Sequence, residues 1–267
     1  MTKFSVLMSV YANEKADYFQ FSLQSIYNQT FVPDEILLVK DGPLTKELES
    51  IINNYSELKV LTIEKNVGLG KALDEGLKHC TYDIIARMDT DDIAKSDRFE
   101  KQLAILIKNP DIDIVGAWID EFEENVDNIK STRKLPENHD EIFRFAKSRN
   151  PINHPVAMFR KQAVLDAGGY QHFPLFEDYY LWVRMLMNGA KFYNIQESLL
   201  FFRFSPEMFK RRGGWKYATT ELKFQNKIRR MDFISYPRFF KNVLLRFVAR
   251  IIPNSFRSCI YKKILRR

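Results

Sequence analysis

The chain has 267 residues, of which 45% are hydrophobic and 28% charged. This composition is typical of a globular protein and excludes a disordered chain. Cys80 and Cys259 lie far apart without a partner motif, which indicates neither a disulfide framework nor a zinc site. No apolar stretch reaches the roughly 18 residues of a membrane-spanning helix, and the start of the chain lacks the apolar core of a signal peptide. We therefore expect a cytoplasmic protein.

The net charge of +7 conceals an asymmetry along the chain. Residues 206–267 contain 17 Lys and Arg but only three acidic residues, whereas residues 1–205 contain 24 basic and 31 acidic residues. An acidic body with a basic end favours an anionic partner at that end.

Segments with the apolar patterns of strands and helices alternate through the first part of the chain. In chain order, strand, helix, strand, helix, strand, helix and strand are expected over residues 4–10, 18–29, 35–40, 44–55, 59–64, 70–78 and 82–88. Asp17 is expected to cap the first helix. The alternation predicts an α/β fold with a mainly parallel, Rossmann-like sheet covered by helices on both faces. Ligands of such sheets bind beyond the carboxyl ends of the strands, where Asp41 and residues 89–92 fall.

Three carboxylates, in Asp89-Thr90-Asp91-Asp92, follow the last of these strands. Clustered aspartates repel one another unless a cation lies among them, and divalent metals such as Mg²⁺ prefer oxygen ligands. An ordinary solvated turn is the alternative, because Asp is common in turns. A calcium-binding EF-hand loop is excluded, since Ala94 stands where that loop needs Gly and Ile93 where it needs an oxygen ligand.

A second acidic pair, Glu177-Asp178, opens an aromatic segment. A carboxylate here could act as a general base, and a metal with a base suggests transfer away from a phosphate leaving group. Alternatively, Asp178 caps a helix over residues 179–187, a position that Asp favours. Both roles can hold at once. Trp182 lies one helical turn further on and is expected in the core.

The segment Asn66-Val67-Gly68-Leu69-Gly70-Lys71 has the composition of a phosphate-binding loop. A dinucleotide fingerprint would need Gly in place of Leu73, and the glycine spacing of a Walker loop is absent. The segment is therefore either a flexible turn before a helix or a phosphate cradle of another type, with Lys71 facing a diphosphate.

Together these motifs resemble the inverting nucleotide-sugar glycosyltransferases of family 2, which have the GT-A fold. The matching segments occur in the family's order and cover residues 10–13, 25–30, 35–42, 66–76, 89–92, 168–170 and 177–182. The chain is most similar to the bacterial exopolysaccharide and lipopolysaccharide branch, and residues 39–43 and 208–214 resemble a capsule-type, amylovoran-like subgroup.

The resemblance implies a role for each motif. A UDP-linked sugar donor would contact Val10, Tyr11, Asn13, Asp41, Asn66, Gly68, Lys71, Asp89 and Thr90. Mn²⁺ or Mg²⁺ would be held by Asp89, Asp91 and Asp92. Asp178 would be the catalytic base on the acceptor side, with Glu177 orienting or binding the acceptor. Contacts to the acceptor or the diphosphate are expected from His154, Arg203, Lys210 and Arg211. For His154, a hydrogen-bonded loop histidine is the alternative.

The chain departs from the family pattern in three places. Lys40-Asp41-Gly42-Pro43 stands where most members have Asp-Asp-Gly-Ser, so one of two usual acids is missing. Phe202-Arg203-Phe204-Ser205 replaces the Tyr-Arg-x-His element of many relatives and puts Ser in the place of His. The Gln-x-x-Arg-Trp element of processive synthases is absent, which favours an enzyme that adds a single sugar.

The basic end contains an amphipathic segment over residues 238–252, stopped by Pro253. On a helical wheel, the cations Arg238, Lys241, Arg246 and Arg250 lie opposite the apolar residues Phe240, Val243, Phe247, Val248 and Ile251. We expect an interfacial helix on the anionic inner leaflet of the plasma membrane. The alternative is a helix that packs against the catalytic domain.

The sequence thus predicts a GT-A catalytic domain over residues 1–205 and a basic helical tail for membrane association over residues 206–267. Residues 1–105 would bind the nucleotide-sugar and residues 106–205 the acceptor. The expected activity is metal-dependent transfer of a sugar to a lipid-linked or saccharide acceptor in surface polysaccharide synthesis. A nucleic-acid-binding protein that uses the basic tail is the alternative, although no base-reading module is visible. A sugar-1-phosphate nucleotidyltransferase is disfavoured, because residues 5–13 lack its Gly-rich, Arg-containing start.

Overall fold

The computed structural model describes residues 2–204 and 214–251. Lys210 and Arg211, expected to contact the acceptor or the diphosphate, lie outside the described residues. The first half of the chain follows the predicted alternation of strands and helices. Its elements are β1 (Phe4–Val10), α1 (Ala16–Tyr27), β2 (Glu35–Asp41), α2 (Lys46–Asn53), β3 (Lys59–Ile63), α3 (Leu69–His79) and β4 (Ile84–Arg87).

The second half of the chain adds shorter strands and further helices. In chain order they are β5 (Ile93–Ala94), α4 (Arg98–Lys108), β6 (Ile114–Phe122), β7 (Ile129–Arg133), α5 (His139–Ala146), the 3-10 turn η1 (His154–Val156), β8 (Met158–Arg160), α6 (Lys161–Asp166), α7 (Glu177–Met187), β9 (Phe192–Arg203), α9 (Gly214–Arg230) and α10 (Tyr236–Ile251).

One predicted helix cap is wrong. α1 begins at Ala16, after a Lys15 whose side chain makes no cap hydrogen bond, so Asp17 lies inside the first turn. A carboxylate there still stabilises the helix, because it faces the positive end of the helix dipole. α2 does have a side-chain cap, since Thr45 Oγ1 accepts a hydrogen bond from the Leu48 N–H at 3.3 Å.

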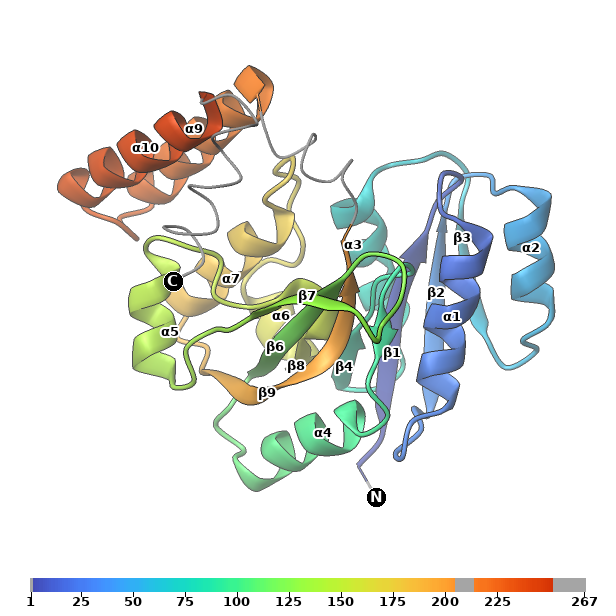
Figure 1. The fold of residues 1–267 in the computed structure, drawn as a ribbon. Coiled ribbons are helices and arrows are strands. Elements are labelled where there is room, and N and C mark those ends of the chain that lie inside the picture. The colour runs from blue at the N-terminus through green and yellow to red at the C-terminus, as the bar shows by residue number, and fades with distance from the viewer. Residues whose placement is uncertain (1, 205–213, 252–267) are drawn as a thin grey trace.

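The strands form one sheet in the order β3-β2-β1-β4-β8-β6-β9-β5, with β7 beside β6. β3, β2, β1 and β4 are parallel, and the remaining strands are mixed in direction. Neighbouring side chains of a strand point to opposite faces: Leu7 belongs to the apolar cluster under α3 and α7, and Val6 and Met8 belong to the cluster under α1, α2 and α4. This arrangement confirms the predicted α/β fold (Figure 1).

The carboxyl ends of β1, β2 and β4 lie at one edge of the sheet. The register places Val10 opposite Lys40 and Leu7 opposite Arg87 in parallel pairs. The segments that follow these strands, including the acidic residues 89–92, therefore meet at this edge.

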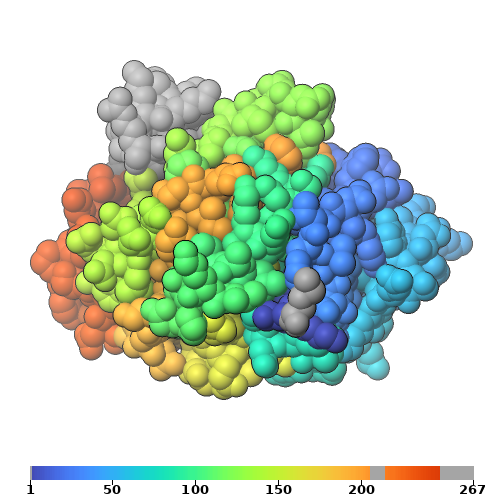
Figure 2. Space-filling model, turned by 90° about the horizontal axis from the view of Figure 1, so that it is seen from below, coloured from blue at the N-terminus to red at the C-terminus, as the bar shows by residue number. Residues whose placement is uncertain are grey.

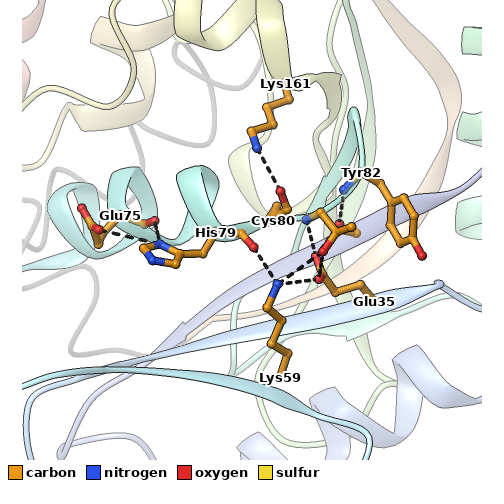
Figure 3. Close-up of polar contacts among 9 residues, drawn as sticks. Glu35, Lys59, Glu75, His79, Cys80, Tyr82 and Lys161 are labelled. Atoms are coloured by element: carbon orange, nitrogen blue, oxygen red, sulfur yellow. Dashed lines mark hydrogen bonds and ion pairs between the residues drawn. The ribbon is translucent and has the colours of Figure 1, made fainter.

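A polar network around Glu35 lies at the opposite edge of the sheet, where β1, β2 and β3 begin (Figure 3). The Glu35 carboxylate accepts hydrogen bonds from Ser5 Oγ at 2.7 Å, the Thr81 N–H at 2.8 Å and Lys59 Nζ at 2.9 Å. Burial alone would raise the pKa of Glu35, but the hydrogen bonds from Thr81, Lys59 and Ser5 outweigh it and lower the pKa to about 2. This network joins β1, β2 and β3 to the segment between α3 and β4.

Helix α9 packs into the same apolar cluster as α7. The Phe224 ring of α9 stacks on Phe176, with ring centroids 4.8 Å apart, and lies 4.7 Å from the Tyr179 ring. Phe176 and Tyr179 flank the acidic pair at the start of α7. The first turn of α7 is therefore supported by α9.

Helix α10 packs on α9 at the end of the molecule opposite α2 (Figures 1 and 2). Asn242 Nδ2 donates to Gln225 Oε1 at 2.9 Å, and Arg246 forms an ion pair with the buried Glu221. Arg246 was expected on an exposed cationic arc, and that assignment is wrong because its charge neutralises Glu221. The side chains of Phe247, Val248, Arg250 and Ile251 lie outside the described part of the structure. Within residues 2–204 and 214–251, no helix is long and apolar enough to cross a membrane.

Candidate active site

The acidic segment 89–92 is held against the last strand of the sheet. β5 pairs with β9 so that Ile93 lies opposite Phe201, which brings Asp92 beside Arg203. The Arg203 N–H donates to Asp92 Oδ1 at 2.8 Å, and Arg203 Nε donates to the Asp91 carbonyl at 3.0 Å. The Arg203 guanidinium also lies 3.8 Å from the centre of the Tyr18 ring. Arg203 thus fixes the backbone of the acidic loop.

The three carboxylates of this loop fit a divalent cation. Asp89, Asp91 and Asp92 each offer an oxygen, and these atoms lie within 4.8 Å of one another. Asp92 Oδ2 is buried and has no hydrogen-bond partner among the described residues, an arrangement that is unfavourable unless a cation binds there. Burial, with the charges of Asp89 and Glu14, raises the pKa of Asp91 to about 7. Burial and the Asp91 charge raise the pKa of Asp92 as well. The all-oxygen donor set suits Mg²⁺ or Mn²⁺.

Two buried arginines that sequence reasoning missed lie below this loop. Arg87 is completely buried and donates to the Asp89 carboxylate and the Met88 carbonyl. Arg98, also completely buried, donates through Nη2 to the Arg87 carbonyl at 2.6 Å. The signal that could have revealed Arg87 is its position at the end of an otherwise apolar strand, two residues before the first of three acids. A buried charge of this kind requires a partner of opposite sign.

Asp41 organises the loop that precedes α3. Its two carboxylate oxygens accept hydrogen bonds from the Val67 N–H at 2.7 Å and the Gly68 N–H at 3.0 Å. Asn66 Nδ2 donates to the Asp41 carbonyl at 3.2 Å. The φ angle of Gly68 is 88°, a conformation that favours glycine. Lys71 lies in the first turn of α3 and is exposed.

The segment after β1 lies next to the acidic loop. Val10 is buried in the core, whereas Tyr11 and Asn13 are exposed. Thr90 Oγ1 donates to Glu14 Oε2 at 2.6 Å. Glu14, which no sequence motif identified, therefore joins the β1 side of this edge to the acidic loop.

The Glu177-Asp178 pair reaches the same edge from α7. α7 begins at Glu177 and its N-cap, Phe176, makes no side-chain cap bond, so the interpretation of Asp178 as the cap is wrong. The Asp178 carboxylate instead accepts a hydrogen bond from Asn150. Burial raises the pKa of Glu177, and the Asp178 charge adds to this effect. A Cβ atom on Gly70 would lie 3.0 Å from Glu177 Cγ, so Glu177 packs directly against the first turn of α3, which follows the loop organised by Asp41.

His154 is a buried, hydrogen-bonded histidine. Its Nε2 lies 2.9 Å from the Tyr170 hydroxyl, and its ring packs against Tyr170 and Trp182. Burial and the nearby Arg87 charge lower the pKa of His154 well below its usual value, so the ring is neutral at pH 7. This environment is that of the hydrogen-bonded loop histidine considered above. Trp182 is completely buried, as predicted.

A family model described as glycosyl transferase family 2 matches residues 5–169. Among curated proteins, an Escherichia coli UDP-Gal:alpha-D-GlcNAc-diphosphoundecaprenol beta-1,3-galactosyltransferase is 43% identical over 99% of this chain and 97% of its own length. The amylovoran biosynthesis glycosyltransferase AmsE of Erwinia amylovora is 37% identical over 97% of this chain and 98% of its own length. These relatives give no support to the nucleic-acid-binding alternative.

Solved structures with the same fold include residues 1–349 of Staphylococcus aureus TarS in complex with UDP-GlcNAc, at a TM-score of 0.67 and 16% identity over 98% of this chain and 76% of that 1–349 chain. A mannosyltransferase from Pyrobaculum calidifontis, in complex with GDP-Man and Mn²⁺, has a TM-score of 0.65 and 16% identity over 93% of this chain and 70% of that protein. Together with the matching family model and the curated relatives, this likeness shows that the chain belongs to glycosyl transferase family 2 and is a glycosyltransferase with the GT-A fold.

Proposed function

We propose that this glycosyltransferase is metal-dependent and inverting, and that it moves a sugar from a UDP-sugar to a lipid-linked saccharide in surface polysaccharide synthesis. The observation that carries the proposal is the meeting of the acidic loop, the loop organised by Asp41 and the Glu177-Asp178 pair at one edge of the sheet. The activities named for two relatives support the donor and acceptor classes. One relative uses UDP-Gal and a diphosphoundecaprenol-linked GlcNAc, and another serves amylovoran biosynthesis.

On the donor side, Asp89, Asp91 and Asp92 would hold Mn²⁺ or Mg²⁺. The bound ion would stabilise the negative charge that develops on the leaving diphosphate. Lys71 and the N-terminal turn of α3 would favour the same anionic group. Each Asp41 oxygen keeps a second acceptor position for the ribose or base. The remaining donor contacts are assigned to Val10, Tyr11, Asn13, Asn66, Gly68 and Thr90.

On the acceptor side, Asp178 would act as the general base. The acceptor oxygen attacks the anomeric carbon while the bond from that carbon to the diphosphate oxygen breaks, and the electron pair leaves with UDP. The hydroxyl proton passes to the Asp178 carboxylate as the new bond forms. A direct displacement of this kind inverts the configuration at the anomeric carbon. Glu177 would orient the acceptor, and His154, Arg203, Lys210 and Arg211 stay candidates for contacts to acceptor or diphosphate.

The exposed face of α10 would place the enzyme on the cytoplasmic side of an anionic membrane. Tyr236, Phe240 and Leu244, spaced four residues apart, are 63%, 65% and 66% exposed, and we refer to them as the apolar stripe. The exposed cations of α9 and α10 up to residue 246 are Lys216, Lys223, Lys227, Arg230, Arg238 and Lys241. Apolar side chains flanked by cations are typical of helices that bind anionic interfaces.

Metal-dependent release of nucleotide from a panel of nucleotide sugars tests the donor and metal assignments. We expect release from a UDP-sugar, stimulated by Mn²⁺ or Mg²⁺. Asp91→Asn should lower this release by about two to three orders of magnitude, because the charge stabilisation of the leaving group is lost. The fold should persist, since clustered acids are relieved by the loss of one charge.

The matched control is Asp111→Asn, which changes an exposed acid outside the acidic loop. Full release by Asp91→Asn, or by the unaltered enzyme in excess chelator, would contradict the metal assignment.

A further inference from the structure

The acidic pair on α7 has a neighbour that no sequence motif identified. Asn150 Nδ2 donates a hydrogen bond to Asp178 Oδ2 at 2.6 Å. The other carboxylate oxygen, Asp178 Oδ1, accepts the backbone N–H of Tyr179 at 2.7 Å. Because each oxygen accepts a hydrogen bond, the plane of the Asp178 carboxylate is fixed.

Only one orientation of the Asn150 side-chain amide places its oxygen next to a donor and its nitrogen next to an acceptor. Its Oδ1 accepts the Ile152 N–H at 3.4 Å, while its Nδ2 meets the Asp178 carboxylate. The position needs an acceptor on one side and a donor on the other, and an asparagine side chain supplies both. An aspartate would satisfy the Ile152 N–H but would place a second carboxylate against Asp178.

The loop that carries Asn150 is anchored to the sheet. The Pro151 carbonyl accepts Asn194 Nδ2 at 3.1 Å, and Asn153 Nδ2 donates to the Ala117 carbonyl at 2.9 Å. Asn153 and Asn194 are both buried. Because the loop is tied to β6 and β9 at these points, Asn150 meets Asp178 from a rigid support.

We propose that Asn150 is a positioning residue for transfer, holding the Asp178 carboxylate in the orientation that takes the proton from the acceptor hydroxyl. The inference rests on the proposed role of Asp178 as the base. A donor to the ionised form of a carboxylate also favours that form, so Asn150 keeps the base ready to accept a proton.

A double-mutant cycle between Asn150→Ala and Asp178→Asn tests this role. Asn150→Ala removes a hydrogen bond to a charged group and should lower kcat about tenfold, with little change in the KM for the nucleotide-sugar. In the Asp178→Asn background the same substitution should change kcat less than about twofold, because no base is left to position. Asn138→Ala is the matched control, since Asn138 is exposed and makes no side-chain cap bond.

Asn150→Asp separates positioning from loop stability. It keeps an acceptor for the Ile152 N–H but replaces the donor to Asp178 by a like charge. The acidic limb of the kcat–pH profile should therefore move to higher pH, because a neighbouring negative charge raises the pKa of a carboxyl group. This variant also keeps the test valid if Asn150→Ala folds poorly.

Two results overturn the inference and can be told apart. If Asn150→Ala slows both backgrounds equally, or Asn150→Asp leaves the pH profile unchanged, Asn150 has only a structural role while Asp178 can still be the base. If Asp178→Asn alone leaves kcat unchanged, the proposed base is wrong, and the inference about Asn150 falls with it.

Discussion

At the scale of single residues, arginines of the protein itself neutralise part of the negative charge of the acidic loop. Arg87 is buried directly below the loop and donates to the Asp89 carboxylate. Arg203 holds Asp92 through its backbone N–H and Asp91 through its guanidinium. A metal ion therefore has to neutralise mainly Asp91 and Asp92, whose pKa values are raised by burial and by the charges of the neighbouring carboxylates.

Replacement of the proposed base should affect the chemical step and spare donor binding. Asp178→Asn keeps the shape of the side chain and removes its ability to accept a proton. We expect kcat to fall by at least about two orders of magnitude, the usual contribution of a general base, with UDP affinity near normal by calorimetry.

Asp140→Asn is the matched control, because Asp140 also lies in the first turn of a helix and shares the helix-dipole effect. A collapse of UDP affinity in Asp178→Asn would instead assign Asp178 to the donor side or to structure.

At the scale of elements, the first four strands could be predicted closely because buried strands are continuous apolar runs, whereas β5 to β9 were not predicted. β1 has the predicted bounds, and the acidic loop follows β4 as expected. The ends of helices were predicted less accurately, because a helix cap depends on local backbone geometry. Asp17 and Asp178, the two caps considered from the sequence, are not caps in the structure. The partners of the site residues could not be predicted, since Asp92 meets Arg203 over 111 positions and Asp178 meets Asn150 over 28. Such contacts follow from strand pairing and loop anchoring, which a single sequence does not display.

Glu35, at the edge of the sheet away from the site, should make the free energy of unfolding depend on pH. The folded-state pKa of Glu35 is about 2, below its ordinary value of 4.5. Its stabilising effect is therefore complete above about pH 4.5 and is lost as the pH falls toward 2. Because solvent screens part of this effect, we expect Glu35→Gln to lower the free energy of unfolding at pH 7 by about 1–2 kcal/mol.

Urea unfolding at pH 7 and pH 3 measures this difference, which should shrink at the lower pH. Glu124→Gln, a change at an exposed position, serves as the control. An equal deficit at both pH values would mean that Glu35 stabilises the fold by shape and not by its charge.

At the scale of the whole molecule, the proposed membrane surface and the acceptor side of the site share a support. Phe224 of α9 contacts both residues that flank the Glu177-Asp178 pair. α10, which carries the apolar stripe, packs on the same helix (Figure 1). In the proposed function, a lipid-linked acceptor would thus approach Asp178 from the end of the molecule that meets the membrane.

Substitutions in the apolar stripe test this arrangement without disturbing the packed face of α10. Phe240→Ser combined with Leu244→Ser removes two exposed apolar side chains. Binding to phosphatidylglycerol-containing vesicles in a flotation assay should weaken about tenfold or more, because each side chain loses the free energy of leaving water. Nucleotide release with a soluble acceptor should be unchanged, since both side chains are exposed on α10 and neither belongs to the proposed site.

The control is Val32→Ser combined with Ile107→Ser, which removes exposed apolar side chains outside α9 and α10. For the unaltered protein, high salt should weaken vesicle binding only partly. Each cation near the surface contributes about 1 kcal/mol, which salt screens, but the contribution of the apolar stripe persists in salt. If the unaltered protein does not bind anionic vesicles at low salt, α10 serves only to pack against α9, and the apolar stripe must serve another contact.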